Sequence, residues 1–209
     1  CGYDCCSTYN GYSHGQFAYI YVNDGVSSKN YVNYSSIVRC VIATSNQRCL
    51  LYLYNGKIYC PSVNVSMNKC KHFTGIHCVP YVDSNSVTGS ISYSSLVDNN
   101  PSSSIIISFD RSGPKYEIKS CNIIRNIQGA PANDGLIRMY GNTVIENSCI
   151  LENTANYIFL TSSSYTITLS NCTVDSTSNN GFLTTKNTVT KSFILALNHM
   201  STENCHSEY

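Results

Sequence analysis

The sequence has little charge, no tryptophan and no long apolar run. Only 12% of its 209 residues are charged, and the formal net charge is +1. Nucleic acids and anionic membranes are bound through fields of basic side chains, so this low, balanced charge argues against both kinds of partner. An apolar run of about 20 residues, the length that spans a bilayer, is also missing. We therefore expect no nucleic-acid partner and no membrane span in this chain.

The common signatures of catalytic and cofactor sites are missing as well. The sequence contains no GxSxG, P-loop, HExxH or Gly-rich dinucleotide motif. Cys70, His72, His77 and Cys78 resemble a zinc set in residue type, but their strand-like surroundings and an oxidising compartment argue against that interpretation. We predict no cofactor, no metal site and no catalytic residue.

The residues that are abundant favour strands and turns. The chain has 31 Ser, 24 Asn, 16 Thr and 17 Tyr residues. Ser, Asn and Thr side chains hydrogen-bond the nearby backbone and so compete with helix formation. Dense clusters of Ile, Leu, Val and Tyr argue against a disordered chain. The composition predicts a single all-β domain.

An internal repeat of about 27 residues organises the sequence. Residues 118–126 match residues 145–153 almost position by position, and residues 91–99 provide a third copy and residues 32–40 a fourth. A second strand-like segment precedes each copy, beginning near Ala18, Leu50, His77, Ile105, Leu136, Tyr157 and Phe182. Such a repeat predicts a parallel β-helix of about seven coils over residues 17–209. Residues 1–16 form a Cys-rich N-terminal segment or a partial coil.

Stacked coils would align equivalent residues in columns about 4.8 Å apart. Ile91, Ile118 and Ile145 form an expected inward aliphatic column with Val32. A charged column follows, with Arg39, Asp98, Arg125 and Glu152, and Lys119 is expected beside Glu146. Asparagines that close the motif predict an amide ladder at a bend, where Asn tolerates the left-handed conformation. An aromatic column either supports the coil or offers a platform for sugars. The asparagine ladder comprises Asn99, Asn126 and Asn153, and the aromatic ladder Tyr54, Tyr81, Phe109 and Tyr140.

Twelve cysteines, an even number, favour an oxidising compartment and therefore secretion. The pairing stays open. We expect the cysteines of the later half, Cys121, Cys149, Cys172 and Cys205, to include stacked buried thiols. Three N-x-S/T sequons are candidate glycosylation sites at Asn33, Asn64 and Asn171. The disulfide candidates are Cys1, Cys5, Cys6, Cys40, Cys49, Cys60, Cys70 and Cys78.

The repeat carries a resemblance to a known family. Leu96-x-x-Asn99, Ile123-x-x-Asn126 and Ile150-x-x-Asn153 recur together with strand starts such as Gly75-Ile76, Gly135-Leu136 and Gly181-Phe182. They resemble the FxxN and GGA-[ILV] repeats of polymorphic-outer-membrane-protein-like β-helices, whose fold is of the pectate-lyase-like type. Aliphatic residues replace Phe here, and one Gly replaces the pair. The resemblance implies a right-handed helix and a surface or adhesive role, and it transfers no catalytic residue.

These observations favour an extracellular structural or adhesive module. Head-to-tail stacking of copies into a filament, or attachment to flanking regions of a longer surface protein, would cover the terminal coils. Candidate ligands are a glycan or a host or cell-surface molecule. The alternative is a polysaccharide lyase or hydrolase, or a carbohydrate-binding β-helix.

The two alternatives depend on different residues. The best catalytic set is Asp83 and Asp110 with Arg111 and Lys115, although stacked carboxylates at strand ends are more typical of turns. Binding of ice or carbohydrate would depend on a flat threonine array, formed by Thr166 and Thr168 with Thr188 and Thr190.

Overall fold

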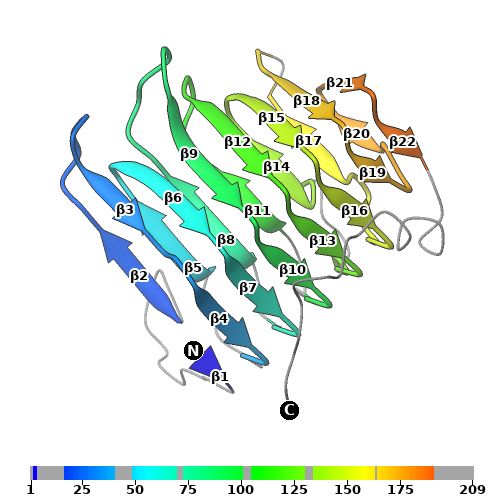
Figure 1. Ribbon diagram of the computed structural model, residues 1–209, viewed down its shortest axis with the longest axis horizontal. Helices are drawn as coiled ribbons and strands as arrows, with labels where there is room; N and C mark the ends of the chain where they lie inside the picture. Colours follow the sequence, from blue (N-terminus) through cyan, green and yellow to red (C-terminus); the bar gives the residue numbers. More distant parts are fainter. Residues whose placement is uncertain are drawn as a thin grey trace.

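The chain is a parallel β-solenoid. A computed structural model describes residues 2–3, 17–40, 49–69, 73–100, 105–129, 134–162 and 164–190. In this part of the chain every paired strand runs parallel to its neighbours, and the strands form three sheets of eight, seven and seven strands. The coils follow one another in chain order along the longest axis of the molecule (Figure 1). The predicted all-β parallel β-helix is confirmed.

Each coil contributes one strand to each sheet. The first sheet, here called sheet A, contains β1 (Gly2–Tyr3), β4 (Ser35–Val38), β7 (Val63–Ser66), β10 (Ser95–Val97), β13 (Asn122–Ile124), β16 (Cys149–Leu151), β19 (Thr173–Val174) and β22 (Val189–Thr190). Sheet B contains β2 (Ala18–Tyr21), β5 (Cys49–Tyr54), β8 (Phe73–Val79), β11 (Ile105–Phe109), β14 (Ile137–Met139), β17 (Phe159–Thr161) and β20 (Asn179–Asn180). Sheet C contains β3 (Lys29–Tyr31), β6 (Lys57–Pro61), β9 (Val87–Ser92), β12 (Lys115–Lys119), β15 (Asn142–Glu146), β18 (Thr166–Ser170) and β21 (Phe182–Lys186).

The number of regular coils is slightly lower than the repeat predicts. Five consecutive coils, from β2–β4 to β14–β16, have at least three residues in every strand. The last two described coils include the two-residue strands β19, β20 and β22. Two-residue β1 pairs with β4, so part of the predicted N-terminal segment joins the stack. About seven full coils is therefore an overestimate, because the end coils are irregular.

The interior is filled by columns of like residues, as expected for stacked coils. Ile91, Ile118 and Ile145 occupy successive positions of sheet C in register, and all three side chains are fully buried. Burying each such side chain contributes about 1.5 to 3 kcal/mol. The column continues into neighbouring coils through Val32, Cys60 and Leu169, which are also buried. The predicted inward aliphatic column is confirmed.

Each regular coil turns sharply at two positions through residues with a left-handed backbone. The first position lies between sheet C and sheet A, and the second lies directly after sheet A. At each of these bends one residue has a φ near +50°. Left-handed residues cost about 1 to 2 kcal/mol unless they are Gly or Asn. The first position is occupied by Tyr34, Ser62, Tyr93, Ser120, Asn147, Asn171 and Asn187, and the second by Arg39, Met67, Asp98, Arg125 and Glu152.

Sheet B departs from the register that the sequence pattern predicts. Tyr54 pairs with Val79, whereas Phe109 pairs with Cys78 and points into the core. Tyr140 follows β14 and donates its backbone N–H to the carbonyl of Phe109. Tyr81 lies beyond the end of β8. The predicted ladder of Tyr54, Tyr81, Phe109 and Tyr140 is wrong, because a shift of one residue moves a side chain to the opposite face of a strand.

The stacked rings lie elsewhere. Outward-facing tyrosines of the first two coils stack in pairs with ring centroids 5.0 to 5.7 Å apart. These pairs are Tyr19 with Tyr52, Tyr21 with Tyr54, and Tyr31 with Tyr59.

The last coil is also assigned differently from the repeat. The segment beginning at Phe182 forms β21 in sheet C, and the strand of sheet B in this coil is the polar pair Asn179–Asn180. Thr168 consequently pairs with Thr184, whose hydroxyl donates to the Thr168 hydroxyl at 3.0 Å. Thr166 pairs with Phe182. The expected stacking of Thr166 and Thr168 on Thr188 and Thr190 is therefore wrong.

Candidate functional site

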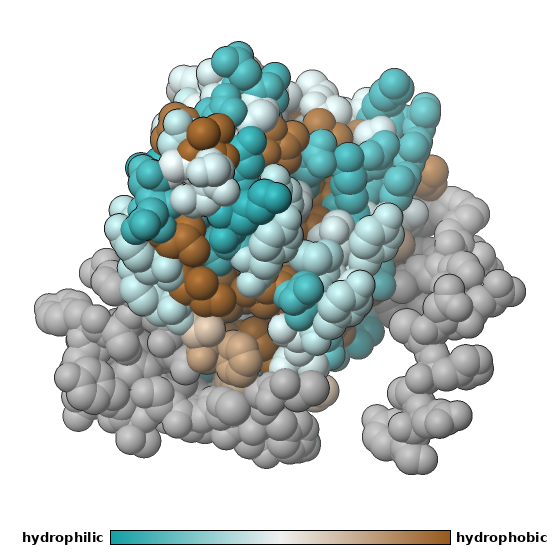
Figure 2. Space-filling view, turned by 60° about the vertical axis from the view of Figure 1, so that its left-hand side comes forward, coloured by the Kyte–Doolittle hydropathy of each residue, from teal (hydrophilic) through white to brown (hydrophobic). Residues whose placement is uncertain are grey.

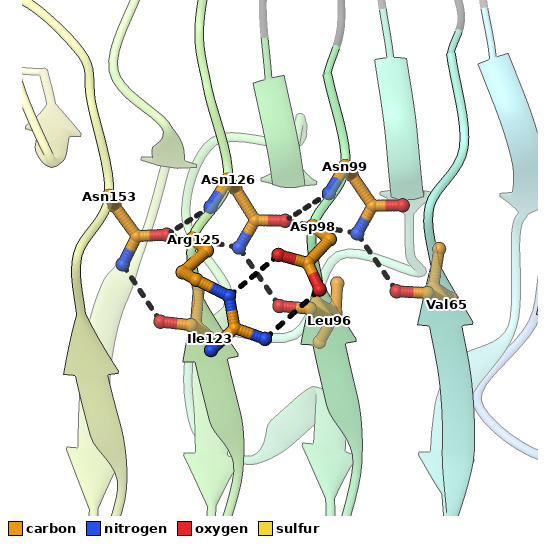
Figure 3. Close-up of polar contacts among 8 residues, drawn as sticks. All are labelled: Val65, Leu96, Asp98, Asn99, Ile123, Arg125, Asn126 and Asn153. Atoms are coloured by element: carbon orange, nitrogen blue, oxygen red, sulfur yellow. Dashed lines mark hydrogen bonds and ion pairs between the residues drawn. The ribbon is translucent and has the colours of Figure 1, made fainter.

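Inward-facing asparagines, most of them buried, form a continuous amide ladder along the axis (Figure 3). The Nδ2 of Asn99 donates to the Oδ1 of Asn126, and the Nδ2 of Asn126 donates to the Oδ1 of Asn153, each at 3.0 Å. Each amide also caps a backbone carbonyl one coil earlier, as Asn126 does for Leu96 at 2.9 Å. The predicted asparagine ladder is confirmed, and its amides tie neighbouring coils together.

The ladder includes a fourth asparagine and, contrary to the prediction, the asparagines are not themselves the left-handed residues of the bends. Asn68, which follows Val65 at the same spacing, donates to Asn99 Oδ1 and to the carbonyl of Ile37. The left-handed residue of each bend is the one before the asparagine, such as Arg125 with a φ of 52°. That bend turns the next side chain inward, so the asparagine is buried and hydrogen-bonded rather than exposed at the turn.

The charged column lies in the predicted register on the surface. Arg125 donates two hydrogen bonds to the carboxylate of Asp98, at 2.7 and 3.0 Å (Figure 3). Lys119 lies 3.9 Å from Glu146 and 3.1 Å from Glu117. The hydrogen bonds that Arg125 donates to Asp98 raise the pKa of Arg125, and the charge of Glu152 makes a smaller contribution. Alternating signs favour the observed alignment of coils, and each exposed pair contributes about 0.2 to 1 kcal/mol.

A second polar row crosses four coils on the outer face of sheet B. The Sγ of Cys49 lies 3.2 Å from His77 Nδ1, and His77 Nε2 lies 3.4 Å from the carboxylate of Asp110. The same carboxylate oxygen accepts a hydrogen bond from Arg138 at 3.2 Å. Tyr52, His77, Ser108 and Arg138 are direct register partners, and Asp110 reaches His77 and Arg138 diagonally. We call Cys49, His77, Asp110 and Arg138 the sheet B relay.

The surroundings of the relay keep its carboxylate ionised. Burial of Asp110 by itself raises its pKa, but His77, whose Nε2 lies 3.4 Å away, and the charge of Arg138 outweigh burial and hold that pKa below its usual range. Arg138 is further fixed by Asp134 and by the Ser108 hydroxyl, each at 3.3 Å.

The order in which the thiol, the imidazole and the carboxylate of the relay follow one another limits the reactions that they can support. Sγ and carboxylate lie at opposite nitrogens of His77, so they cannot share one metal ion through this ring. A thiol, an imidazole and a carboxylate in this order are the arrangement of a nucleophile with an oriented base.

The sequence indicated the members of this row only separately. His77 stood in the zinc set, Cys49 among the disulfide candidates and Asp110 in the carboxylate pair. His77 and Cys78 of that set do not meet, because Cys78 points into the core whereas His77 faces outward. Cys70 and His72 lie outside the described residues.

Asp83 and Asp110, the predicted carboxylate pair, lie in different surroundings. Asp83 accepts hydrogen bonds from Asn85 N–H at 2.9 Å and from the Ser86 hydroxyl, which lower its pKa. It is therefore a turn residue. Arg111 donates to Asn55 at 3.1 Å and lies over the Tyr54 ring, and Lys115 begins β12. Asp83, Asp110 and Arg111 have separate partners, and the four residues do not form a common cluster of hydrogen bonds or ion pairs.

Polar side chains cover most of the face shown in Figure 2, where hydrophobic side chains are visible between them. The stacked tyrosines contribute to the outer surface of the first coils, with Tyr21 57% and Tyr19 46% exposed. Burial raises the pKa of Tyr52, and the nearby Cys49 raises it further. Tyr52 packs against His77 with a centroid distance of 4.7 Å, so these rings adjoin the sheet B relay.

Two of the disulfide candidates are free thiols, and two cysteines of the later half are buried thiols as predicted. Cys60 and Cys78 are buried free thiols that point into the core. Cys40 Sγ lies 3.9 Å from the carbonyl of Val38. Cys121 and Cys172 are buried thiols of one column, whereas Cys149 lies one position further along. Cys1, Cys5, Cys6, Cys70 and Cys205 lie outside the described residues.

The three sequons differ in accessibility. Asn33 and Asn171 are exposed at bends. Asn64 lies within β7, where its amide donates to the Ser36 hydroxyl at 3.2 Å and accepts from the Ser66 hydroxyl. Glycosylation at all three stays a prediction.

Comparison of the chain with known protein families, with curated proteins and with solved structures gave no match. In the described residues, no helix is long and apolar enough to cross a membrane.

Proposed function

We propose that the protein is a structural or adhesive module of an extracellular surface. The observation that carries this proposal is the amide ladder from Asn68 to Asn153, which hydrogen-bonds four coils to one another along the axis. Coils held by buried axial hydrogen bonds form a stiff rod that can present its outer side chains at fixed spacings. The resemblance of the L/I-x-x-N copies to repeats of surface β-helices supports the same role.

The stacked tyrosines favour carbohydrate as the ligand of this module. Tyr19 and Tyr21 alternate along β2 and stack on Tyr52 and Tyr54 of β5, so four phenol rings lie together on one face. Tyrosine offers an apolar ring face and a hydroxyl in one side chain, a combination that suits the mixed surface of a sugar.

An adhesion assay tests this proposal. Beads coated with the purified chain are passed over glycan arrays and cell monolayers under flow, and we expect retention several-fold above that of beads without the chain. Tyr21→Ser should abolish most of this retention. Tyr93→Ser is the matched control, because Tyr93 is 72% exposed at a bend where Ser62 and Ser120 occupy equivalent positions. Equal retention of coated and uncoated beads would contradict the adhesive role.

Head-to-tail stacking of copies is the second part of this proposal. Among the described strands, β20, β21 and β22 stand at one end of the three sheets, and Phe182 in β21 is 58% exposed. Parallel strand edges are templates for further pairing. Sedimentation velocity across a concentration series should reveal oligomers that lengthen with concentration, and Phe182→Asp should reduce them. A single monomer peak at every concentration would overturn the filament.

A further inference from the structure

Three groups of the sheet B relay, a thiol, an imidazole and a carboxylate, could together carry out a reaction, which a purely structural role does not require. Cys49, at the start of β5, is 2% exposed, and its Sγ lies 3.2 Å from the Nδ1 of His77. His77 is 7% exposed and is oriented from its other nitrogen by Asp110 at 3.4 Å. An imidazole between a thiol and a carboxylate can take the thiol proton, because the carboxylate stabilises the imidazolium that forms.

The other charges of the row support this direction of proton transfer. Arg138 binds the same oxygen of Asp110 that faces His77, and Asp134 and Ser108 hold the guanidinium in place. Asp110 therefore stays ionised and does not itself accept the proton. The negative charge beside Nε2 favours a protonated imidazole, and the imidazolium in turn favours a thiolate at Cys49.

The burial of Cys49 limits what this thiolate can attack. A sulfur that is almost fully enclosed cannot reach an acyl group in a peptide or a large ester, so its reaction partner must be a molecule close to water in size. We propose that Cys49 is a peroxide-reactive cysteine, activated by His77 and Asp110 and oxidised by hydrogen peroxide or another small hydroperoxide.

The proposed reaction balances with the groups at hand. His77 takes the proton of Cys49, and the thiolate attacks one oxygen of the peroxide, so that an S–O bond forms and the O–O bond breaks. The leaving hydroxide takes the proton back from His77 and departs as water. The sulfur is oxidised to a sulfenic acid and the peroxide is reduced.

The chain supplies its own comparison thiols. Burial raises the pKa of Cys121 to about 12 and also raises that of Cys172, so both should stay unreactive near neutral pH. Cys149 is the better control, because it is half-buried and lines an open hollow of about 370 Å³ with Asn171 and Val189. Burial raises the pKa of Cys149. It is more accessible than Cys49 but should react more slowly.

The experiment measures oxidation of each cysteine in the reduced, folded chain of 209 residues. The chain is treated briefly with hydrogen peroxide between pH 6 and 8.5, quenched in denaturant with dimedone, digested, and analysed by mass spectrometry. Cys49 counts as oxidised whether it is recovered as the dimedone adduct or as a disulfide. We expect Cys49 to react at least tenfold faster than Cys149 at pH 7, with a rate that changes less than twofold over this range. An ordinary thiol slows about tenfold for each pH unit below its pKa.

Two variants test the roles of the neighbours. His77→Gln should slow oxidation of Cys49 at least tenfold, and Asp110→Asn should slow it several-fold and restore a steep pH profile, while Cys149 is unchanged in both. Circular dichroism checks that each variant is folded, and the wild-type pH profile decides the question if neither folds. A Cys49 rate that is no faster than that of Cys149, or that rises tenfold per pH unit, would overturn the proposal. These outcomes are independent of adhesion and of filament formation.

Discussion

At the scale of single residues, the amide of Asn126 makes four hydrogen bonds in a fully buried position. It donates to Leu96 O and Asn153 Oδ1, and it accepts from the backbone and side-chain N–H groups of Asn99. Asn126→Ala leaves these buried partners unsatisfied, so we expect a loss of about 2 to 4 kcal/mol in the free energy of unfolding. Urea unfolding monitored by circular dichroism measures the loss.

Asn122→Ala is the matched control for this prediction. Asn122 lies in the same coil, within β13, but its side chain is partly exposed on the outer face of the strand. Its substitution should change the free energy of unfolding by less than about 0.5 kcal/mol. If the two variants unfold at the same urea concentration, the ladder does not stabilise the stack.

Asp110 makes the free energy of unfolding depend on pH in the acidic range. Its pKa is raised by burial but lowered, on balance, by His77 and Arg138. The pKa is therefore lower in the folded than in the unfolded chain, where it is about 3.9, so this stabilisation is complete above pH 5 and is lost as the pH falls through the folded value.

Asp110→Asn tests that dependence. The side chain is about one third exposed, so solvent screening limits the loss at pH 7 to about 1 kcal/mol. Urea unfolding of wild type and variant should differ at pH 7 and at pH 5, and the difference should shrink as the pH falls below about 4. A difference that persists undiminished at pH 3 would contradict the assignment of the carboxylate as the titrating group.

At the scale of elements, a bulge in β8 adjusts the register of sheet B. The pairing of β8 with β5 and with β11 shifts between Phe73 and Ile76, around Gly75. A Cβ added at Gly75 would lie 1.9 Å from the carbonyl oxygen of Ile106, so only glycine permits this close approach of two coils.

Gly75→Ala should therefore separate two coils locally. We expect a loss of about 1 to 3 kcal/mol in the free energy of unfolding, because the backbone must move to accept the methyl group. Gly25→Ala is the control, since its added Cβ would meet only the Ser28 hydroxyl at 3.5 Å. Thermal unfolding that is identical in both variants would exclude a role for the close contact.

At the same scale, the repeat predicts the alignment of coils of equal length but not the register of sheet B. The period of 27 residues correctly aligned Asn99 with Asn126 and Lys119 with Glu146, because the coils between them have equal length. Phe109 was misplaced because a one-residue offset reverses the face of a strand, and nothing in the pattern marks the bulge at Gly75. The relay was missed for a related reason, since Cys49, His77 and Asp110 meet through unequal spacings and a diagonal contact. The polar strand Asn179–Asn180 has no hydrophobic signal at all.

At the scale of the whole molecule, the described coils of the solenoid contact their neighbours along the axis, so stability is not spread evenly over distant coils. Each coil is stabilised mainly by its two neighbours, so local opening should follow local packing. The coils of β10, β13 and β16 have the amide ladder and buried aliphatic columns. In the last described coil, by contrast, every β22 residue and four of the five β21 residues are exposed.

Hydrogen exchange measured by mass spectrometry should reproduce this gradient. We expect backbone amides of β10, β13 and β16 to exchange at least a hundredfold more slowly than those of β21 and β22. Asn126→Ala should accelerate exchange in β13, which belongs to the same coil, and in β10 of the preceding coil. Exchange in the more distant β4 should change less, because the lost hydrogen bonds join neighbouring coils. Uniform acceleration along the chain would instead show that the described coils unfold as one cooperative unit, and the picture of a rod stabilised coil by coil would have to be abandoned.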